Sequence, residues 1–341
     1  MKNQKRVTIY DLAKEMGVSA SYISRALNNN PSISVKTREA VKKKALELNY
    51  KHNSHAANLR QGSSKTIGVI VPHINQSFFS EAIAGIEEVC FENNHSLIIC
   101  QSHESYEHEC KAIETLIHQN VDCILISVSA ETQSFPHLQN IQNHSIHLIQ
   151  FDRCMDQVNS IKVYNDNKEA SYAATKKLFD HGYKKVAFLG GPNHIGIFRD
   201  RKEGFLTALK ESGNIIPYNF IVEDVLLKQK AKETIIDLLS SKERPDAFLT
   251  VSDHQSLMVL EVAHSKGIKV PEELGVFGFT NEAFSSLIKP SLSSVDQKSK
   301  DLGKIAAKIY FEELKKGSAP KIKTQAKIVK CEILVRESSK R

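Results

Sequence analysis

The start of the chain has the apolar spacing of a short amphipathic helix. Apolar residues recur at i, i+3, i+4 and i+7 from Ile9 to Met16, which is one face of a helix. Thr8 can cap this helix with Asp11 as its reciprocal partner. Gly17 can end it in the left-handed conformation that costs glycine little.

Two further helices follow by the same reasoning. Ser19 can cap a helix from Ala20 to about Asn28, residues 28–31 are typical of a turn, and Ser34 can open a third helix. Such an arrangement predicts a helix-turn-helix unit, although the helical pattern alone also allows a plain three-helix bundle with a basic surface. The side chains expected to face inward from the last two helices are Ile23, Leu27, Val41, Ala45 and Leu48.

From residue 66 onward, short apolar runs alternate with helical stretches. The runs recur about every 25 to 35 residues, which is typical of β-α-β units with parallel strands. We therefore expect an α/β body of two lobes, each a parallel sheet between helices. The predicted strands are Ile67–Val71, Leu97–Cys100, Cys123–Ile126, His147–Phe151, Val186–Gly190, Ala247–Val251 and Leu274–Phe279.

The positive charge of the chain lies entirely in its first fifth. Residues 1–65 hold 13 of the 46 Lys and Arg and 4 of the 39 Asp and Glu, so they carry +9 and the remainder carries −2. This asymmetry is typical of a head that binds a polyanion, joined to a neutral body. In a helix-turn-helix unit the second helix enters the major groove of DNA. Ser21, Tyr22 and Arg25 would point outward from it, and Arg25 suits a bidentate contact with guanine.

Composition argues against several other classes of protein. The six cysteines form no C-x-x-C pair, which favours reduced thiols over a disulfide framework or a zinc site. His52 and His55 form an H-x-x-H pair without a nearby Cys or carboxylate, so we expect no metal and no cofactor. No run approaches the roughly 20 apolar residues of a membrane helix, and the N-terminus lacks the apolar region of a signal peptide. We expect a cytoplasmic protein without membrane contact.

Residues 7–50 carry a long motif of fixed positions. It reads T-hydrophobic-x-D-hydrophobic-A-x-x-x-G-V-S, then S-R-x-hydrophobic-N, then S-x-x-T-R-x-x-V and L-x-Y. In this motif the chain resembles the lactose/galactose repressor (LacI/GalR) family. The resemblance implies a sequence-specific DNA-binding regulator, a repressor in most members. It implies DNA contacts from Thr8, Tyr10, Ser19, Ala20, Ser21, Tyr22, Ser24, Arg25 and Asn28.

Residues 53–60 resemble the hinge helix of that family, which folds when two copies meet on DNA. The resemblance implies that Ala56 packs against its symmetry mate and that Leu59 wedges into the central base step from the minor groove. Arg60 would hold phosphate or base edges. One departure is His52, where many members have proline.

The body resembles the family's periplasmic-sugar-binding-protein-like sensor over its whole length, with markers such as Asn165–Asn167 and Gly278–Phe279. In that fold the chain crosses between the lobes three times, here near residues 164, 292 and 323. The implied division is a helix-turn-helix domain at 1–52, a hinge and linker at 53–65 and an effector core at 66–339. The core would form lobe one from 66–164 and 293–323, and lobe two from 165–292 and 324–339.

Small molecules bind such folds between the lobes, at the C-terminal ends of the strands. Arg201 can clamp hydroxyls or a carboxylate, and Asp152 can accept from sugar hydroxyls. Phe78 and Phe79 can stack on a ring but can equally be core residues, and Asp253 can equally be a helix cap. The expected effector contacts are Phe78, Phe79, Asp152, Ile195, Ile197, Arg201, Asp253 and Thr280.

Two departures bear on the ligand. Thr280 stands where most relatives have an aspartate, and Ile195 and Ile197 fill a loop that is polar in several of them. The pocket therefore suits a carbohydrate or related metabolite that is less hydroxylated or differently presented. One rival interpretation is a free sugar-binding or transport component of the same two-lobe fold, but the fused head and the absence of a signal peptide argue against it. Another is an enzyme, but the glycines of residues 190–196 lack the Lys-Ser/Thr of a phosphate loop, so we expect no enzyme.

The expected assembly is a homodimer on a near-palindromic operator, because symmetric proteins match symmetric DNA. Residues 331–338 are followed by no heptad segment that would join dimers into a tetramer. The effector would favour one arrangement of the lobes and thereby control the hinge. A coupling free energy of about 1–3 kcal/mol is enough for such control.

Overall fold

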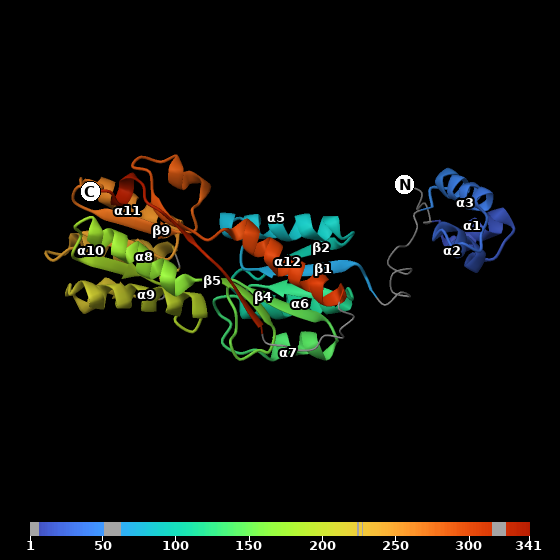
Figure 1. Ribbon diagram of the computed structural model, residues 1–341, viewed down its shortest axis with the longest axis horizontal. Helices are drawn as coiled ribbons and strands as arrows, with labels where there is room; N and C mark the ends of the chain where they lie inside the picture. Colours follow the sequence, from blue (N-terminus) through green and yellow to red (C-terminus); the bar gives the residue numbers. More distant parts are fainter. Residues whose placement is uncertain (1–6, 51–62, 224, 227, 316–324) are drawn as a thin grey trace. The chain divides into compact units, whose positions relative to one another are not determined.

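A computed structural model describes residues 7–50, 63–223, 225–226, 228–315 and 325–341. The chain divides into two compact units, a head (Met1–Ser64) and a body (Lys65–Arg341), which appear in blue and in light blue to red in Figure 1. The boundary lies one residue before the predicted one. No helix within the described ranges is long and apolar enough to cross a membrane.

The head contains three helices, α1 (Ile9–Met16), α2 (Ala20–Leu27) and α3 (Val35–Glu47). The first helix has the predicted reciprocal cap, in which the Asp11 amide donates to Thr8 Oγ1 at 3.3 Å and the Thr8 amide donates to Asp11 Oδ2 at 2.8 Å. It ends at Gly17, whose φ is 66°. Ser19 and Ser34 cap the next two helices through their side chains, as predicted.

The core of the head differs from the prediction at two leucines. Leu27 and Leu48 are only partly buried, whereas Ala26 is fully buried. Helix α2 has two turns and places residues 23 and 26 toward the other helices, so residue 27 lies at the edge of the contact. The buried core consists of Leu12, Ala13, Ile23, Ala26, Ile33, Val41 and Ala45.

The first lobe of the body is a six-stranded parallel sheet in the order β11-β5-β4-β3-β1-β2. Apolar clusters cover both faces, one under α5 and α12 and the other under α6 and α7. The strands are β1 (Thr66–Val71), β2 (Ser96–Gln101), β3 (Cys123–Ile126), β4 (His147–Phe151), β5 (Ile161–Asn165) and β11 (Gln325–Val329). The helices are α5 (Ser77–Glu92), α6 (Tyr106–His118), α7 (Pro136–Asn143) and α12 (Ser299–Lys315).

The second lobe is a six-stranded sheet in the order β12-β10-β9-β8-β6-β7, in which only the pairing of β12 with β10 is antiparallel. Its strands are β6 (Val186–Leu189), β7 (Ile221–Val222), β8 (Ala247–Thr250), β9 (Gly275–Phe279), β10 (Ser293–Asp296) and β12 (Glu332–Leu334). Its helices are α8 (Asn167–Asp180), α9 (Gly196–Ser212), α10 (Lys228–Ser240) and α11 (Asp253–Ser265). Short 3₁₀ turns are η1 (Tyr218–Phe220), η2 (Ala283–Ser286) and η3 (Glu337–Ser339). The predicted two-lobe α/β body with a helical head is confirmed.

The crossings between the lobes differ from the predicted positions. Strand β10 pairs with β9 in the second sheet, so the second crossing follows Asp296 rather than residue 292. Strand β11 pairs with β5 in the first sheet, so the third crossing follows Val329 rather than residue 323. The first crossing follows Asn165, close to the predicted 164. A short apolar run predicts a strand, but only its partner decides to which sheet it belongs.

Candidate functional site

The second helix of the head presents its polar side chains outward. Ser21 and Arg25 are exposed, as are Tyr10 at the start of α1 and Asn28 after α2. Tyr22 is half-buried and packs against the core of the head. The other expected DNA-contacting side chains of the head are exposed at Thr8 and Ser19 and half-buried at Ala20 and Ser24. Ser21 and Arg25 thus point outward as predicted, whereas Tyr22 packs partly against the core because α2 turns its ring toward the other helices. Which of these side chains contact DNA stays a prediction.

Part of the sequence motif has a structural role in the head. Arg38 on α3 donates from Nη1 to the carbonyl oxygen of Asn29 at 3.3 Å, and Lys42 donates to Asn29 Oδ1 at 2.9 Å. Asn29 has a φ of 54°, so two side chains hold a left-handed turn residue. Thr37 and the capping Ser34 also share a hydrogen bond of 2.8 Å. Arg38 of the motif thus helps to fix the turn after α2, whereas Thr37 contributes to the start of α3.

The hinge residues Ala56, Leu59 and Arg60, and the pair His52 and His55, lie outside the described residues. Their predicted roles stay predictions.

The body contains a cavity of about 1040 Å³ with lining residues from both lobes. Its size matches a site for a small molecule of ordinary dimensions. Several of the lining residues follow directly after strands, such as Asp152 after β4, Val251 after β8 and Thr280 after β9. The C-terminal ends of parallel strands therefore meet at this cavity. Six of the predicted effector contacts line it, namely Phe78, Phe79, Asp152, Ile197, Arg201 and Thr280.

Arg201 is fixed in its orientation within the wall of the cavity. Its Nε donates to Asn167 Oδ1 at 2.8 Å and its Nη1 donates to the Val251 carbonyl oxygen at 2.9 Å. The guanidinium carbon lies 4.3 Å from the centroid of the Phe279 ring. Burial lowers the pKa of Arg201 to about 10, so it stays charged at neutral pH. These two bonds use two of the five N–H donors of the guanidinium.

A second arginine, which the sequence did not single out, lies in the same cavity. Arg153 donates from Nη1 to Glu104 Oε2 at 2.7 Å and its Nε lies 4.0 Å from Asp152 Oδ2. Its guanidinium carbon lies 5.8 Å from the Phe79 ring centroid in the first lobe and 5.5 Å from that of Phe198 in the second. Arg153 Nε is buried without a hydrogen-bond partner among the described residues. The side chain therefore occupies the space between the two aromatic walls.

The carboxylates of this cluster have opposite pKa shifts. Burial raises the pKa of Asp152 above its ordinary value, although Arg153 and Arg201 oppose the shift. At Glu104 burial acts in the same direction, but the charge and hydrogen bond of Arg153 and the Ala130 amide outweigh it and lower the pKa. Glu104 is thus the fixed counter-ion of Arg153, and Asp152 is the carboxyl whose ionisation costs most.

Two predicted effector contacts do not reach the cavity. Ile195 is buried in the apolar core of the second lobe, where it precedes α9. Asp253 is also fully buried, and it is Ser252 that caps α11. Asp253 instead accepts hydrogen bonds from the Glu282 amide at 2.8 Å and from Ser285 Oγ and Ser294 Oγ at 2.7 Å each. It ties the turn after β9 to α11, a role that the sequence did not indicate.

Several lining residues were missed at the sequence level. Arg153 directly follows the nominated Asp152, and Phe198 follows Ile197, so the neighbours of both nominated residues also contribute. Glu104, Gln297 and Glu282 come from loops whose sequence shows no distinctive pattern. Four histidines also line the cavity, His73, His103, His194 and His254.

The three crossings between the lobes are joined through one side chain. Asn165 Nδ2 donates to the carbonyl oxygens of Gln297 at 2.8 Å and of Val329 at 3.1 Å. Asn165 is 2 % exposed. The Cys331 amide donates to Asp166 Oδ1 at 2.7 Å. The Asn165–Asn167 marker therefore lies where the chain crosses between the two lobes, next to the cavity.

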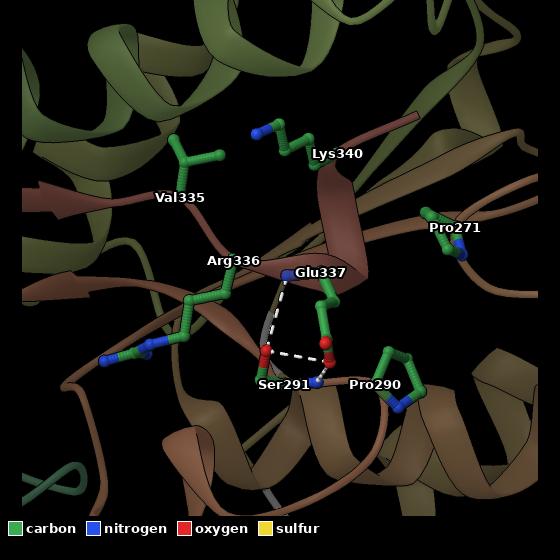
Figure 2. Close-up of a pocket in the computed structure, with 7 residues that line it drawn as sticks. All are labelled: Pro271, Pro290, Ser291, Val335, Arg336, Glu337 and Lys340. Carbon is green, nitrogen blue, oxygen red and sulfur yellow. Dashed lines mark hydrogen bonds between the residues drawn. The ribbon is translucent and has the colours of Figure 1, made fainter.

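A second hollow, of about 540 Å³, lies at the end of the second lobe (Figure 2). Its polar groups already bond to one another, since the Ser291 amide and hydroxyl donate to Glu337 Oε2 at 2.8 and 3.0 Å. Its lining comes from the second lobe alone. The cavity between the lobes is therefore the better candidate for the effector. Within the described ranges, no cluster of three His, Cys, Asp or Glu side chains has the arrangement of a metal site.

A helix-turn-helix head joined to a two-lobed binding body defines a class, the DNA-binding transcription regulators controlled by small molecules. Comparisons with known proteins agree. Residues 8–53 match bacterial regulatory proteins of the lacI family, and residues 175–339 match a periplasmic binding protein-like domain. The chain is 30% identical over 312 residues to catabolite control protein A of Priestia megaterium, which covers 91% of this chain and 93% of that protein.

Further relatives agree with this assignment. The chain is 30% identical over 308 residues to the HTH-type transcriptional repressor PurR of Vibrio atlanticus (strain LGP32), over 90% of this chain and 92% of that protein. In fold it is similar to the lac repressor dimer bound to operator and the anti-inducer ONPF, with a TM-score of 0.82, 22% identity and coverage of 98% and 99%. The chain belongs to the lacI family of bacterial regulatory proteins and is a DNA-binding transcriptional regulator. The family and the function predicted from the motif are confirmed, and these relatives are regulators, not enzymes.

Proposed function

We propose that this chain is a cytoplasmic homodimeric repressor that binds a near-palindromic operator, and that a carbohydrate or related metabolite in the cavity between its lobes controls operator affinity. The observation that carries the proposal is the cavity itself. Its walls come from both lobes, and Arg201, Asp152 and the ring of Phe79 converge on it. A sugar ring offers hydroxyls to the first two and an apolar face to the third.

Related structures support the choice of ligand class. The transcriptional regulator CelR is described as a cellobiose complex and is similar to this chain with a TM-score of 0.72 and 22% identity. A LacI family regulator from Enterococcus faecium is described with bound ribose and has a TM-score of 0.68 and 24% identity. We propose a ligand of similar chemistry for this chain, with Thr280 as the neutral contact after β9.

The DNA part of the proposal is tested by selecting binding sites for the full chain from random duplex DNA. The expected result is one enriched sequence with dyad symmetry, because a symmetric dimer presents two equal recognition helices. Enrichment of sequences without dyad symmetry contradicts the homodimer. No enrichment at all contradicts sequence-specific binding.

The effector part is tested by thermal unfolding with a panel of ribose, xylose, glucose, cellobiose and their phosphorylated forms. A ligand that binds only the folded state stabilises it by mass action and so raises the unfolding temperature. The free energy of unfolding increases by about 2.7 kcal/mol when the ligand concentration is 100 times Kd. A hit should be lost in Arg201→Ala and kept in Lys210→Ala, whose side chain is exposed near the other end of the same helix. A shift that survives Arg201→Ala contradicts the assigned site, and a response to none of these sugars contradicts the ligand class.

A further inference from the structure

Helix α5 of the first lobe, whose first turn lines the cavity, begins without a side-chain cap from its own N-cap residue. Helix α5 starts at Ser77, and the side chain of the preceding Gln76 makes no capping hydrogen bond. Its first turn contains no acidic residue. The N-terminus of a helix presents unpaired N–H groups and a partial positive charge, so it favours an anionic partner. The sequence next to α5 does not supply one.

A carboxylate from the other lobe lies at this point. Glu282 of the second lobe accepts a hydrogen bond from the hydroxyl of Ser77, the first residue of α5. Glu282 is 7 % exposed, and the Nε2 atom of His254 lies 3.8 Å from its Oε1. A buried carboxylate needs hydrogen-bond donors, and the hydroxyl of Ser77 supplies one at the start of α5.

The loop that carries Glu282 is held rigidly in the second lobe. The backbone amide of Glu282 donates to the buried carboxyl of Asp253 at 2.8 Å. Gly278 on β9 makes room for this contact, because a Cβ there would lie 2.1 Å from Asp253 Oδ1. Thr280 and Asn281 have φ values of 115° and 57° and turn the chain sharply after β9. The side chain of Glu282 therefore projects from a fixed position.

Two further polar contacts between the lobes near the cavity are exposed, whereas the contact of the Arg153 guanidinium with the Phe198 ring is buried. His194 Nε2 lies 2.8 Å from the Ala130 carbonyl oxygen, and the side chain of His194 is exposed. Arg199 pairs with Asp156 at 3.2 Å, with 45% and 64% of their side chains exposed. Exposed ion pairs contribute little to stability, whereas hydrogen bonds to buried charges contribute more. The contact of Glu282 with Ser77 is thus the strongest of the three polar contacts.

We propose that Glu282 is a latch residue between the lobes, which binds the hydroxyl of Ser77 at the N-terminus of α5 in the first lobe and stabilises the arrangement in which the two lobes touch. The proposal rests on the function proposed above, because Glu282 also lines the effector cavity. A ligand that reaches this carboxylate changes the contact with α5. The equilibrium between lobe arrangements is then linked to effector occupancy through one side chain.

The test is hydrogen exchange of the full chain without ligand, for the wild type and for Glu282→Gln, Ser77→Ala and the double variant. Because the contact joins two lobes, each single change should act on the opposite lobe. Glu282→Gln should speed exchange at the first turn of α5, residues 77–82, by on the order of tenfold. Ser77→Ala should speed exchange at residues 281–287 by a similar factor. The double variant should exchange no faster than the single ones.

A matched control is Glu261→Gln, which removes an exposed carboxylate that lines the same cavity from α11. It should leave both segments unchanged. Exchange within α8 and α9 reports whether each variant keeps its fold. Effects confined to the mutated lobe, or additive effects in the double variant, would overturn the latch. The outcome does not depend on operator or effector, so a failure here is distinct from a failure of the proposed function.

Discussion

Arg25 and Arg38 show that two arginines of one motif can serve different purposes. Arg38 is bound to the carbonyl oxygen of Asn29 and holds the turn, whereas Arg25 is exposed on the face of α2 that carries Ser21. A planar fork of donors on that face matches the edge of guanine in the major groove. The contact of Arg25 with a guanine stays a prediction, which its exposure permits.

Arg25→Ala is expected to cost about 1–3 kcal/mol in operator binding and to relax the base preference at one position of each half-site. Binding to a set of single-base operator variants measures both effects. Lys43→Ala, at an exposed position of α3, is the control and should weaken binding evenly over all sequences, if at all. An unchanged base preference in Arg25→Ala would contradict the groove assignment.

Asp253 gives a prediction about pH. Burial raises its pKa to about 7, although Ser294, Ser285 and the Glu282 amide lower it. The folded state then keeps a proton that the unfolded chain releases above about pH 4. The contribution to stability is fully present below pH 4 and is lost as the pH rises toward 7.

The free energy of unfolding by urea, compared between wild type and Asp253→Asn, measures this contribution. The wild type should lose up to about 1.4 kcal/mol per pH unit relative to the variant between about pH 4 and 7. Parallel pH profiles for the two proteins would mean that Asp253 is ionised in the folded state throughout this range.

Among the elements, pairs of helices approach closely at glycine. A Cβ at Gly85 of α5 would lie 2.1 Å from the Lys300 carbonyl oxygen of α12, and one at Gly303 would lie 2.0 Å from that of Ala82. The two helices lie side by side on the first sheet in Figure 1. The backbone of α12 thus fits against α5 only because both helices have a glycine at the contact.

Gly85→Ala is therefore expected to destabilise the body by about 1–3 kcal/mol, since backbone cannot move aside as a flexible side chain can. Glu87→Ala, at an exposed position of the same helix, should change stability by less than about 0.5 kcal/mol. Thermal or urea unfolding compares the two. Equal stability of both variants would show that α12 shifts without cost.

At the scale of the whole molecule, Asn165 connects the three segments of chain that cross between the lobes. Asn165→Ala removes the donor to the Gln297 carbonyl oxygen, and a buried group left unpaired costs about 1–3 kcal/mol. The Val329 carbonyl oxygen also loses this bond but keeps its bond from the Asp166 amide. Hydrogen exchange at residues 296–298 and 329–331 should rise. Exchange at β3 and β8, in the centres of the two sheets, is the internal control and should stay constant.

The link between body and DNA is tested at Leu59. Leu59→Ala should reduce specific operator affinity and leave nonspecific, salt-sensitive binding largely intact, because a wedge acts only in a correctly seated complex. Titrations with operator and with random duplex at several salt concentrations separate the two. An equal loss on both DNAs would contradict the wedge.

The sequence by itself determined the features that depend on local chemistry. Caps at Thr8, Ser19 and Ser34, the left-handed end at Gly17 and the alternation of strands and helices all follow from residues close together in the chain. The charge of the head follows from composition alone. The motif also led to Arg201 and Asp152, because each stands at a fixed distance from a strand or marker.

Only the tertiary structure decided which distant residues meet. The observed crossings follow β10 and β11, later than predicted, because the sheet to which a strand belongs depends on a partner elsewhere in the chain. It removed Asp253 and Ile195 from the cavity, because the orientation of a side chain at a strand end depends on what packs behind it. It brought Arg153 to Glu104 and Glu282 to Ser77 through loops whose sequences carry no periodic pattern. Polar contacts between residues far apart in the chain leave no pattern in the neighbouring sequence, and so they can be identified only in the folded structure.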